Sequence, residues 1–160
     1  ESIFNLINHS KKFNIKLKNS IIFDMFSGVG SFGIECLSQE AKYVFFFENY
    51  KEVLPLLKKN LNNLKSNNNY KIIEKDIYDE KIFFNLKAKV NIIFLDPPYR
   101  DKNIEKILNT IRDLDLLDRN GIIILHRHKK DKIILPKKYN IIDERKYGIS
   151  KIIFLNYLDQ

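Results

Sequence analysis

Apolar runs of strand length alternate with segments of helical periodicity from Ser20 to about Ile124. Most of these runs are continuously apolar, which is typical of parallel strands buried on both faces. The pattern predicts strands over Ile21–Phe23, Tyr43–Phe47, Lys71–Glu74, Val90–Leu95 and Gly121–Leu125. It predicts helices over Ser2–Phe13, Ser31–Gln39, Lys51–Leu64, Glu80–Leu86 and Ile104–Leu117. This order indicates successive βαβ units around a parallel sheet with helices on both faces.

The C-terminal part follows a different rule. Asn140–Arg145 and Lys151–Tyr157 both have the composition of strands, but only Lys146 to Ser150 separates them. A parallel pair needs a crossover of a dozen or more residues, so this pair must form an antiparallel hairpin. The sequence therefore predicts a mostly parallel, seven-stranded α/β sheet that ends in an antiparallel hairpin, and 160 residues suit one domain spanning 1–160.

The net charge of +8 suits a polyanionic partner such as a nucleic acid. The window from Arg127 to Lys151 holds nine Lys and Arg against three acids, and so carries +6 of that charge. An AT-rich coding bias or an ordinary solvated charge run would also produce such a surplus. A single cysteine, Cys36, excludes an internal disulfide, and the three histidines lack zinc-like spacing, so we expect no metal. Because no apolar run approaches 20 residues, we expect a cytoplasmic protein and no membrane partner.

The first strand leads into a glycine-rich loop that contains Gly28, Gly30 and Gly33 in a G-x-G-x-x-G pattern. Such a loop lets the backbone approach a ligand at a helix N-terminus. A nicotinamide dehydrogenase would share this pattern, but its strand usually runs almost directly into the first glycine. Here Asp24 and three further residues intervene, so the loop is too long for tight pyrophosphate binding.

Three successive strand ends carry an acid, namely Asp24, Glu48 and Asp76. The carboxyl ends of parallel strands meet at the edge where ligands of open α/β sheets bind. Three carboxylates would repel a pyrophosphate. They suit a cofactor with a cationic amino-acid part, a ribose diol and an adenine amine.

The most specific motif is Asp96-Pro97-Pro98-Tyr99, directly after an apolar strand. The two prolines fix the backbone and leave rigid carbonyl acceptors beside the Asp96 side chain, while Tyr99 adds a flat stacking surface. Hydrogen bonds from an amine to Asp96 and to the Pro97 carbonyl would orient the nitrogen lone pair toward an electrophilic methyl group. The motif therefore predicts amine methylation on a planar base.

In these motifs and their order the chain resembles the Rossmann-like class I methyltransferases that depend on S-adenosylmethionine. The opening Glu1-Ser2-Ile3-Phe4-Asn5-Leu6-Ile7 and the closing Arg145-Lys146-Tyr147-Gly148 resemble, more narrowly, the RsmD-like bacterial 16S rRNA guanine-N2 methyltransferases. The resemblance implies transfer of a methyl group to the N2 amine of a guanine in 16S rRNA, free or within the small ribosomal subunit.

The resemblance also implies roles for individual residues. The methionine end of the cofactor would contact Asp24, Phe26, Ser27, Gly28 and Gly30. The ribose would contact Glu48, the adenine would contact Asp76 and Ile77, and the guanine would lie against Asp96, Pro97, Pro98 and Tyr99. The basic window, with Lys129, Lys130 and Lys132, would contact phosphates, and we expect a monomer.

Two features depart from the family pattern. Family members usually carry an Arg before Glu1 and a short basic segment upstream, so we expect this chain to lack that segment. They also tend to carry Glu after the fifth strand, where this chain has His126, which we interpret as a structural histidine.

Other functions stay open at this point. A DNA adenine or cytosine amino-methyltransferase uses the same Asp-Pro-Pro-Tyr motif, although 160 residues leave no room for a separate DNA-recognition domain. A protein-amide methyltransferase uses a related loop that typically begins with Asn, and it would not explain the basic window. A non-catalytic RNA-binding or ribosome-assembly protein could keep the fold, but it would have no evident need for the acids or for Asp96.

Overall fold

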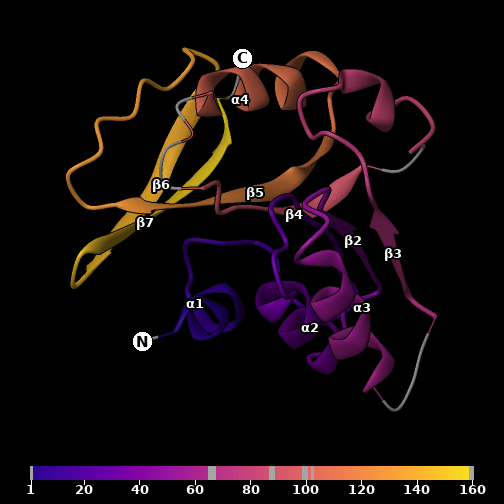
Figure 1. Ribbon diagram of the computed structural model, residues 1–160. Coiled ribbons are helices and arrows are strands. Elements are labelled where there is room, and N and C mark those ends of the chain that lie inside the picture. The colour runs from indigo at the N-terminus through magenta and orange to yellow at the C-terminus, as the bar shows by residue number, and fades with distance from the viewer. Residues whose placement is uncertain (1, 65–67, 87–88, 99–100, 102, 159–160) are drawn as a thin grey trace.

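The computed structural model describes residues 2–64, 68–86, 89–98, 101 and 103–158. A seven-stranded sheet forms the middle layer, with strand order β3-β2-β1-β4-β5-β7-β6 (Figure 1). The strands are β1 Ile21–Asp24, β2 Tyr43–Phe47, β3 Tyr70–Ile73, β4 Val90–Leu95, β5 Leu117–His128, β6 Tyr139–Tyr147 and β7 Ser150–Tyr157. The helices are α1 Ile3–His9, α2 Ser31–Ser38, α3 Leu54–Asn62, the 3-10 helix η1 Glu80–Phe83 and α4 Ile104–Asp113.

The predicted fold class is confirmed, including the antiparallel hairpin. Strands β1 to β5 pair in parallel, whereas β7 runs antiparallel to both β5 and β6. Two of the predicted strands, Tyr43–Phe47 and Val90–Leu95, have the predicted ends. None of the described helices is long and apolar enough to cross a membrane.

The last of the predicted helices, Ile104–Leu117, is shorter in the structure. The sequence pattern predicts that this helix runs to Leu117, but α4 ends at Asp113. Asp115 has a positive φ of 51°, which a right-handed helix does not accommodate. Leu117 instead begins β5, four residues before the predicted start at Gly121, and pairs with Val90 of β4. The apolar side chains that suggested one long helix are therefore divided between a helix and a strand.

Three other helical segments also differ from the prediction at their ends. The opening helix ends at His9 rather than Phe13, because Ser10 is extended, with ψ of 134°. The helix predicted from Lys51 begins at Leu54, with Pro55 in its first turn, where a missing N–H costs no hydrogen bond. The segment from Glu80 forms a 3-10 helix that ends at Phe83.

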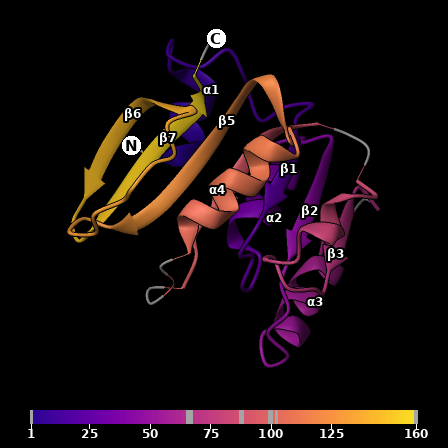
Figure 2. The same cartoon turned by 90° about the horizontal axis from the view of Figure 1, so that it is seen from above.

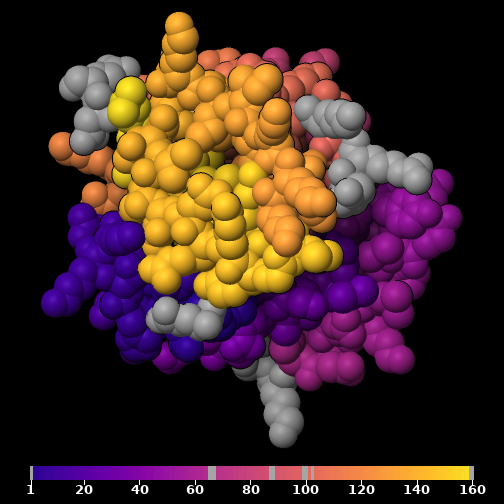
Figure 3. Space-filling view, turned by 90° about the vertical axis from the view of Figure 1, so that its left-hand side faces the viewer, coloured from indigo at the N-terminus to yellow at the C-terminus, as the bar shows by residue number. Residues whose placement is uncertain are grey.

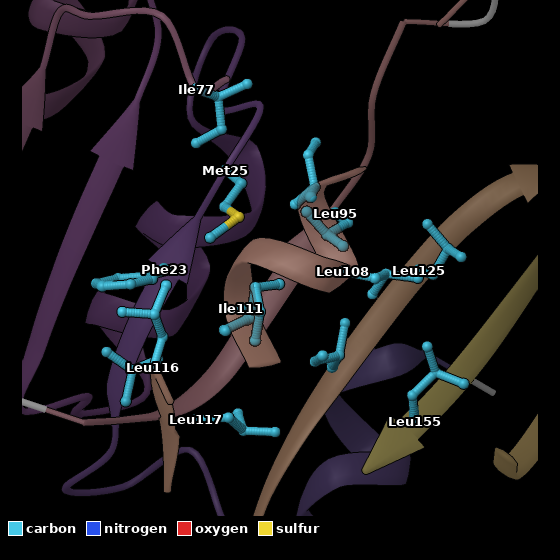
Figure 4. Close-up of a cluster of buried hydrophobic side chains, with 14 of the residues drawn as sticks. Phe23, Met25, Ile77, Leu95, Leu108, Ile111, Leu116, Leu117, Leu125 and Leu155 are labelled. Atoms are coloured by element: carbon cyan, nitrogen blue, oxygen red, sulfur yellow. The ribbon is translucent and has the colours of Figure 1, made fainter. Parts of the chain in front are cut away.

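Helices cover both faces of the sheet and enclose two apolar clusters. On one face α4 packs against the sheet through Ile107, Leu108 and Ile111, which meet Phe23 and Leu125 in one cluster (Figures 2 and 4). The cluster on the opposite face joins residues of α1, α2 and α3, including the fully buried Cys36, to the sheet. With both faces covered, polar groups are left to the strand ends and the loops that follow them.

Helix α2 lies close to β2 because a glycine stands at the contact. A Cβ added to Gly33 would lie 2.3 Å from a ring carbon of Phe46 and 3.0 Å from a methyl carbon of Val44. Both partners are fully buried and cannot move away without disturbing the core. The third glycine of the loop therefore serves helix–sheet packing.

We expect Gly33→Ala to destabilise the protein by about 1–3 kcal/mol, because the added methyl overpacks this contact. At an exposed helical site the same change would stabilise by about 1 kcal/mol, so the sign is diagnostic. Urea denaturation measures the difference in the free energy of unfolding. Ser38→Ala, at an exposed position of the same helix, should stay within about 0.5 kcal/mol of the wild type.

Candidate active site

The carboxyl ends of the parallel strands bring the predicted acids to one edge of the sheet. Asp24 ends β1, where it pairs with Phe46 of β2 and Phe94 of β4. Glu48 follows β2 directly, Asp76 follows β3 by three residues, and Asp96 follows β4 directly. Four acids that are far apart in the sequence thus face one region.

Asp24 is buried with an incomplete set of partners. Its side chain is 1% exposed, and Oδ2 accepts a hydrogen bond from the Gly33 amide at 3.1 Å. Oδ1 is also buried and has no donor among the described residues. Burial, with a smaller contribution from the nearby carboxylates of Asp96 and Glu48, raises the pKa of Asp24 to about 7. A cation beside the unpaired Oδ1 would stabilise the ionised form of this buried carboxyl group, so the site favours a cationic ligand.

Glu48 is held by the backbone of the loops around it. Its Oε1 accepts from the Gly28 amide at 2.8 Å and its Oε2 accepts from the Tyr50 amide at 3.0 Å. These two bonds fix the carboxylate at the end of β2, half-buried, and each oxygen keeps a further lone pair. The group can accept additional hydrogen bonds from a diol.

Gly30 shapes the entry to α2. It is the N-cap of that helix with φ of 92°, a conformation that a side chain rarely adopts, and an added Cβ would meet Leu57 at 2.6 Å. Gly30 has no side chain to cap the helix, and Asp24 already accepts from the Gly33 amide, so the amides of Ser31 and Phe32 remain available to an anion.

Two hollows open at this edge of the sheet. One, of ≈ 380 Å³, is lined by Glu48, Asp76, Ile77 and Pro98, among others. The other, of ≈ 510 Å³, is lined by Asp24, Ser27, Phe32 and Phe94, with Ile3 and Phe4 of α1 as an additional wall. Phe26, Gly28 and Asp96 line both hollows. A ligand lying across both would pass directly by the Asp96 carboxylate.

Asp96 has a partner that sequence reasoning did not supply. Nδ1 of His126 lies 2.8 Å from Oδ1 of Asp96. The contact raises the pKa of His126 above its ordinary value through the hydrogen bond to Asp96, against the opposing effect of burial. The interpretation of His126 as a structural histidine gave it no place at the site, whereas the structure puts its side chain against Asp96. The available signal was that Leu95 and Leu125 end equivalent apolar runs, and they pair in register.

A second group of polar contacts holds the loop after Asp96 at Asp101. Arg127, almost fully buried, donates to the Asp101 carbonyl at 3.0 Å and forms an ion pair with Asp131 at 3.2 Å. The Tyr78 hydroxyl donates to the Asp101 carboxylate, which together with burial raises the pKa of Tyr78. The sequence analysis did not single out Tyr78 or Asp101.

Not every predicted residue lines a hollow. Gly30 and Pro97 are buried beside the hollows, and Tyr99 lies outside the described residues. Lys129, Lys130 and Lys132 are exposed in the segment after β5, where the Lys129 amide donates to the Ile149 carbonyl at 2.7 Å. Across the described ranges, no three His, Cys, Asp or Glu side chains are grouped as a metal ion would require.

The segment that carries Lys129, Lys130 and Lys132 lies on the same side of the molecule as the tip of the β6–β7 hairpin. Figure 3 shows the orange and yellow residues of the C-terminal third in the middle of one face, next to the indigo N-terminal segment. Because β7 runs antiparallel to β5, its start at Ser150 lies beside His128, two residues beyond His126. The exposed lysines are thus neighbours of the site along the sheet edge.

The buried Asp24 predicts a measurable pH dependence of stability. Because its pKa is raised to about 7, the native state keeps a proton that the unfolded state loses above about pH 4. The wild type should therefore lose stability relative to Asp24→Asn as the pH rises from 4 to 7, by up to about 1.4 kcal/mol per pH unit. Urea denaturation at several pH values measures this gap. The exposed Asp113→Asn should follow the wild type, and a constant gap for Asp24→Asn would contradict the prediction.

Two curated relatives match most of the chain. The ribosomal RNA small subunit methyltransferase D of Buchnera aphidicola subsp. Acyrthosiphon pisum is 31% identical over 133 residues, which cover 81% of this chain and 66% of the relative. The protein of the same name from Haemophilus influenzae is 31% identical over 134 residues, covering 83% and 69%. The chain thus spans about two thirds of the length of these relatives.

Solved structures agree with this similarity. A proposed methylase from Haemophilus influenzae superposes with a TM-score of 0.74 at 30% identity, covering 89% of this chain and 82% of that one. A proposed methyltransferase from Escherichia coli gives a TM-score of 0.77 at 23% identity, covering 90% and 80%, and supports the fold alone. The family described as conserved hypothetical protein 95 matches residues 1–156. The resemblance found in the sequence is thereby confirmed, and the chain belongs to this family.

Proposed function

We propose that this chain transfers a methyl group from S-adenosylmethionine to the exocyclic N2 amine of a guanine in 16S rRNA. The observation that carries the proposal is the place of Asp96, which lines both hollows where they adjoin. The names of the relatives support ribosomal RNA of the small subunit as the substrate, and the family resemblance supports guanine N2.

The residues around the two hollows fit the parts of S-adenosylmethionine. The unpaired Oδ1 of Asp24 would accept from the ammonium group, and the uncapped amides of α2 beyond Gly30 would attract the carboxylate. Phe26, Ser27 and Gly28 would contact the same methionine part, since they line the hollow beside Asp24.

The nucleoside part of the cofactor fits the other hollow. The free lone pairs of Glu48 would accept from the ribose hydroxyls. Ile77 is 9% exposed and offers an apolar surface to adenine. Asp76, whose Oδ1 accepts from the Tyr78 amide at 3.0 Å, would accept from the adenine amine. When bound, the cofactor supplies an electrophilic methyl group on a sulfonium.

The acceptor amine is oriented by the loop after β4. In this proposal the Asp96 carboxylate and the Pro97 carbonyl accept from the guanine amine and direct its lone pair to the methyl carbon. The N–C bond forms as the C–S bond breaks, the electron pair remains on sulfur, and the amine proton passes to Asp96 and then to water. Pro98 lines the hollow at this point, and Tyr99 would stack on the base.

We expect Asp96→Ala to lower methyl transfer by at least ~100-fold, because the amine loses its orienting acceptor. Labelled methyl transfer to undermethylated small subunits, free 16S rRNA and duplex DNA measures it in parallel. Asp113→Ala, exposed at the end of α4, should retain the wild-type rate. Label in rRNA or subunits as N2-methylguanine supports the proposal. Label in DNA alone would instead support a DNA amino-methyltransferase.

Binding of the cofactor tests the reaction class independently of the substrate. A ligand that binds the native state raises its unfolding temperature, so S-adenosylhomocysteine should produce a thermal shift in the wild type. Absence of any shift would favour a non-catalytic RNA-binding protein. That the protein acts in the cytoplasm as a monomer stays a prediction.

The exposed lysines after β5 should contribute to RNA binding through phosphate contacts. Replacing Lys129, Lys130 and Lys132 by Glu should weaken RNA binding and lower the slope of log affinity against log salt by about 1 per lost contact. Binding of S-adenosylhomocysteine should not change. The matched control replaces three lysines that are exposed on other elements, Lys59, Lys71 and Lys81, by Glu. Equal loss of RNA and cofactor binding would show that the first three lysines matter for folding instead.

A further inference from the structure

The Asp96 carboxylate is supported from one side only. Its side chain is 45% exposed, and among the described residues His126 is its single hydrogen-bond partner, at 2.8 Å. An exposed aspartate without such a bond exchanges among several side-chain rotamers. The bond to Oδ1 restricts that rotation and leaves Oδ2 available to another donor.

His126 is itself rigidly placed. It lies in β5 between the parallel neighbour β4 and the antiparallel neighbour β7, where it pairs with Ile152. The next residue, Arg127, is anchored by Asp101 and Asp131 on the opposite face of the strand. A donor built on a central strand holds its acceptor more precisely than a donor on a loop would.

The direction of the bond follows from the groups around the ring. Carboxylates only accept, so Nδ1 of His126 carries the proton that is donated to Asp96. The pKa of His126 is raised by this bond, while Arg127 lowers it. On the side of α1, the hollow next to Asp96 is lined by Ile3 and Phe4, which carry no charge. Asp96 and Arg127 are thus the charged groups that act on His126, and Asp96 is the one hydrogen-bonded to it.

We propose that His126 is a positioning residue for methyl transfer: its Nδ1–H orients the Asp96 carboxylate so that Oδ2 accepts from the acceptor amine. This inference rests on the proposed function. His126 lines neither of the two hollows. Because the effect of His126 passes through Asp96, we expect its replacement to change the rate of methyl transfer and not the binding of cofactor or RNA.

The first test separates turnover from binding. His126→Ala should lower kcat by about 10- to 100-fold, with the KM for RNA and the Kd for S-adenosylhomocysteine within about two-fold of the wild type. His126→Asn places an N–H at the same position along the side chain and should recover most of kcat. His9→Ala, an exposed histidine at the end of α1, should behave as the wild type.

The second test needs no turnover. The pKa of His126, followed by NMR and assigned with His126→Asn, should fall in the Asp96→Ala variant, since the accepting carboxylate is gone. An unchanged pKa would overturn the contact. An unchanged kcat in His126→Ala, no recovery in His126→Asn, or equal loss of cofactor binding would overturn the positioning role. If the wild type methylates no nucleic acid at all, the proposed function fails, and the NMR titration still decides whether His126 holds Asp96.

Discussion

The parallel pairing of β1 with both β2 and β4 is the constraint on which the site depends. It aligns Asp24 with Phe46 and Phe94, and so brings the loops after three strands to one edge. A strand with neighbours on both sides and helices over both faces has to be apolar along its whole length. The acids Asp24, Glu48, Asp76 and Asp96 are therefore confined to the ends of the strands and the loops at that edge.

Burial of Asp24 shows that stability was not the only requirement on this edge. A carboxyl group that is 1% exposed and satisfied at only one oxygen costs the native state free energy as soon as it ionises. An apolar residue of similar size would avoid that cost. Local conflicts of this kind are expected where a binding site takes precedence over packing. A cationic ligand at Oδ1, as proposed, would remove the conflict.

The C-terminal hairpin supports the candidate site through strand β5. Antiparallel pairing of β7 with β5 makes β5 a central strand, which gives His126 and Arg127 a rigid backbone on opposite faces of the sheet. One side chain then reaches Asp96, and the other reaches Asp101 at the far end of the same loop. The loop that carries the predicted chemistry is thus held by its own prolines and also by β5. The same pairing brings the exposed Lys129 and Lys130 beside the hairpin tip.

The sequence by itself determined the strands of a mostly parallel sheet, its antiparallel hairpin and the acids at the strand ends. Hydrophobic periodicity and loop length are local properties of the chain, and they sufficed to place β2 and β4 and to make the last two strands a hairpin. Helix ends were less predictable: α4 and β5 divide an apolar run at Asp115, whose positive φ is a tertiary outcome. Only the folded structure decided that His126 meets Asp96 and that Asp24 is left with an unpaired oxygen. Both depend on strand register and burial, which join residues that are 9 to 30 positions apart and leave no periodic signal in the sequence.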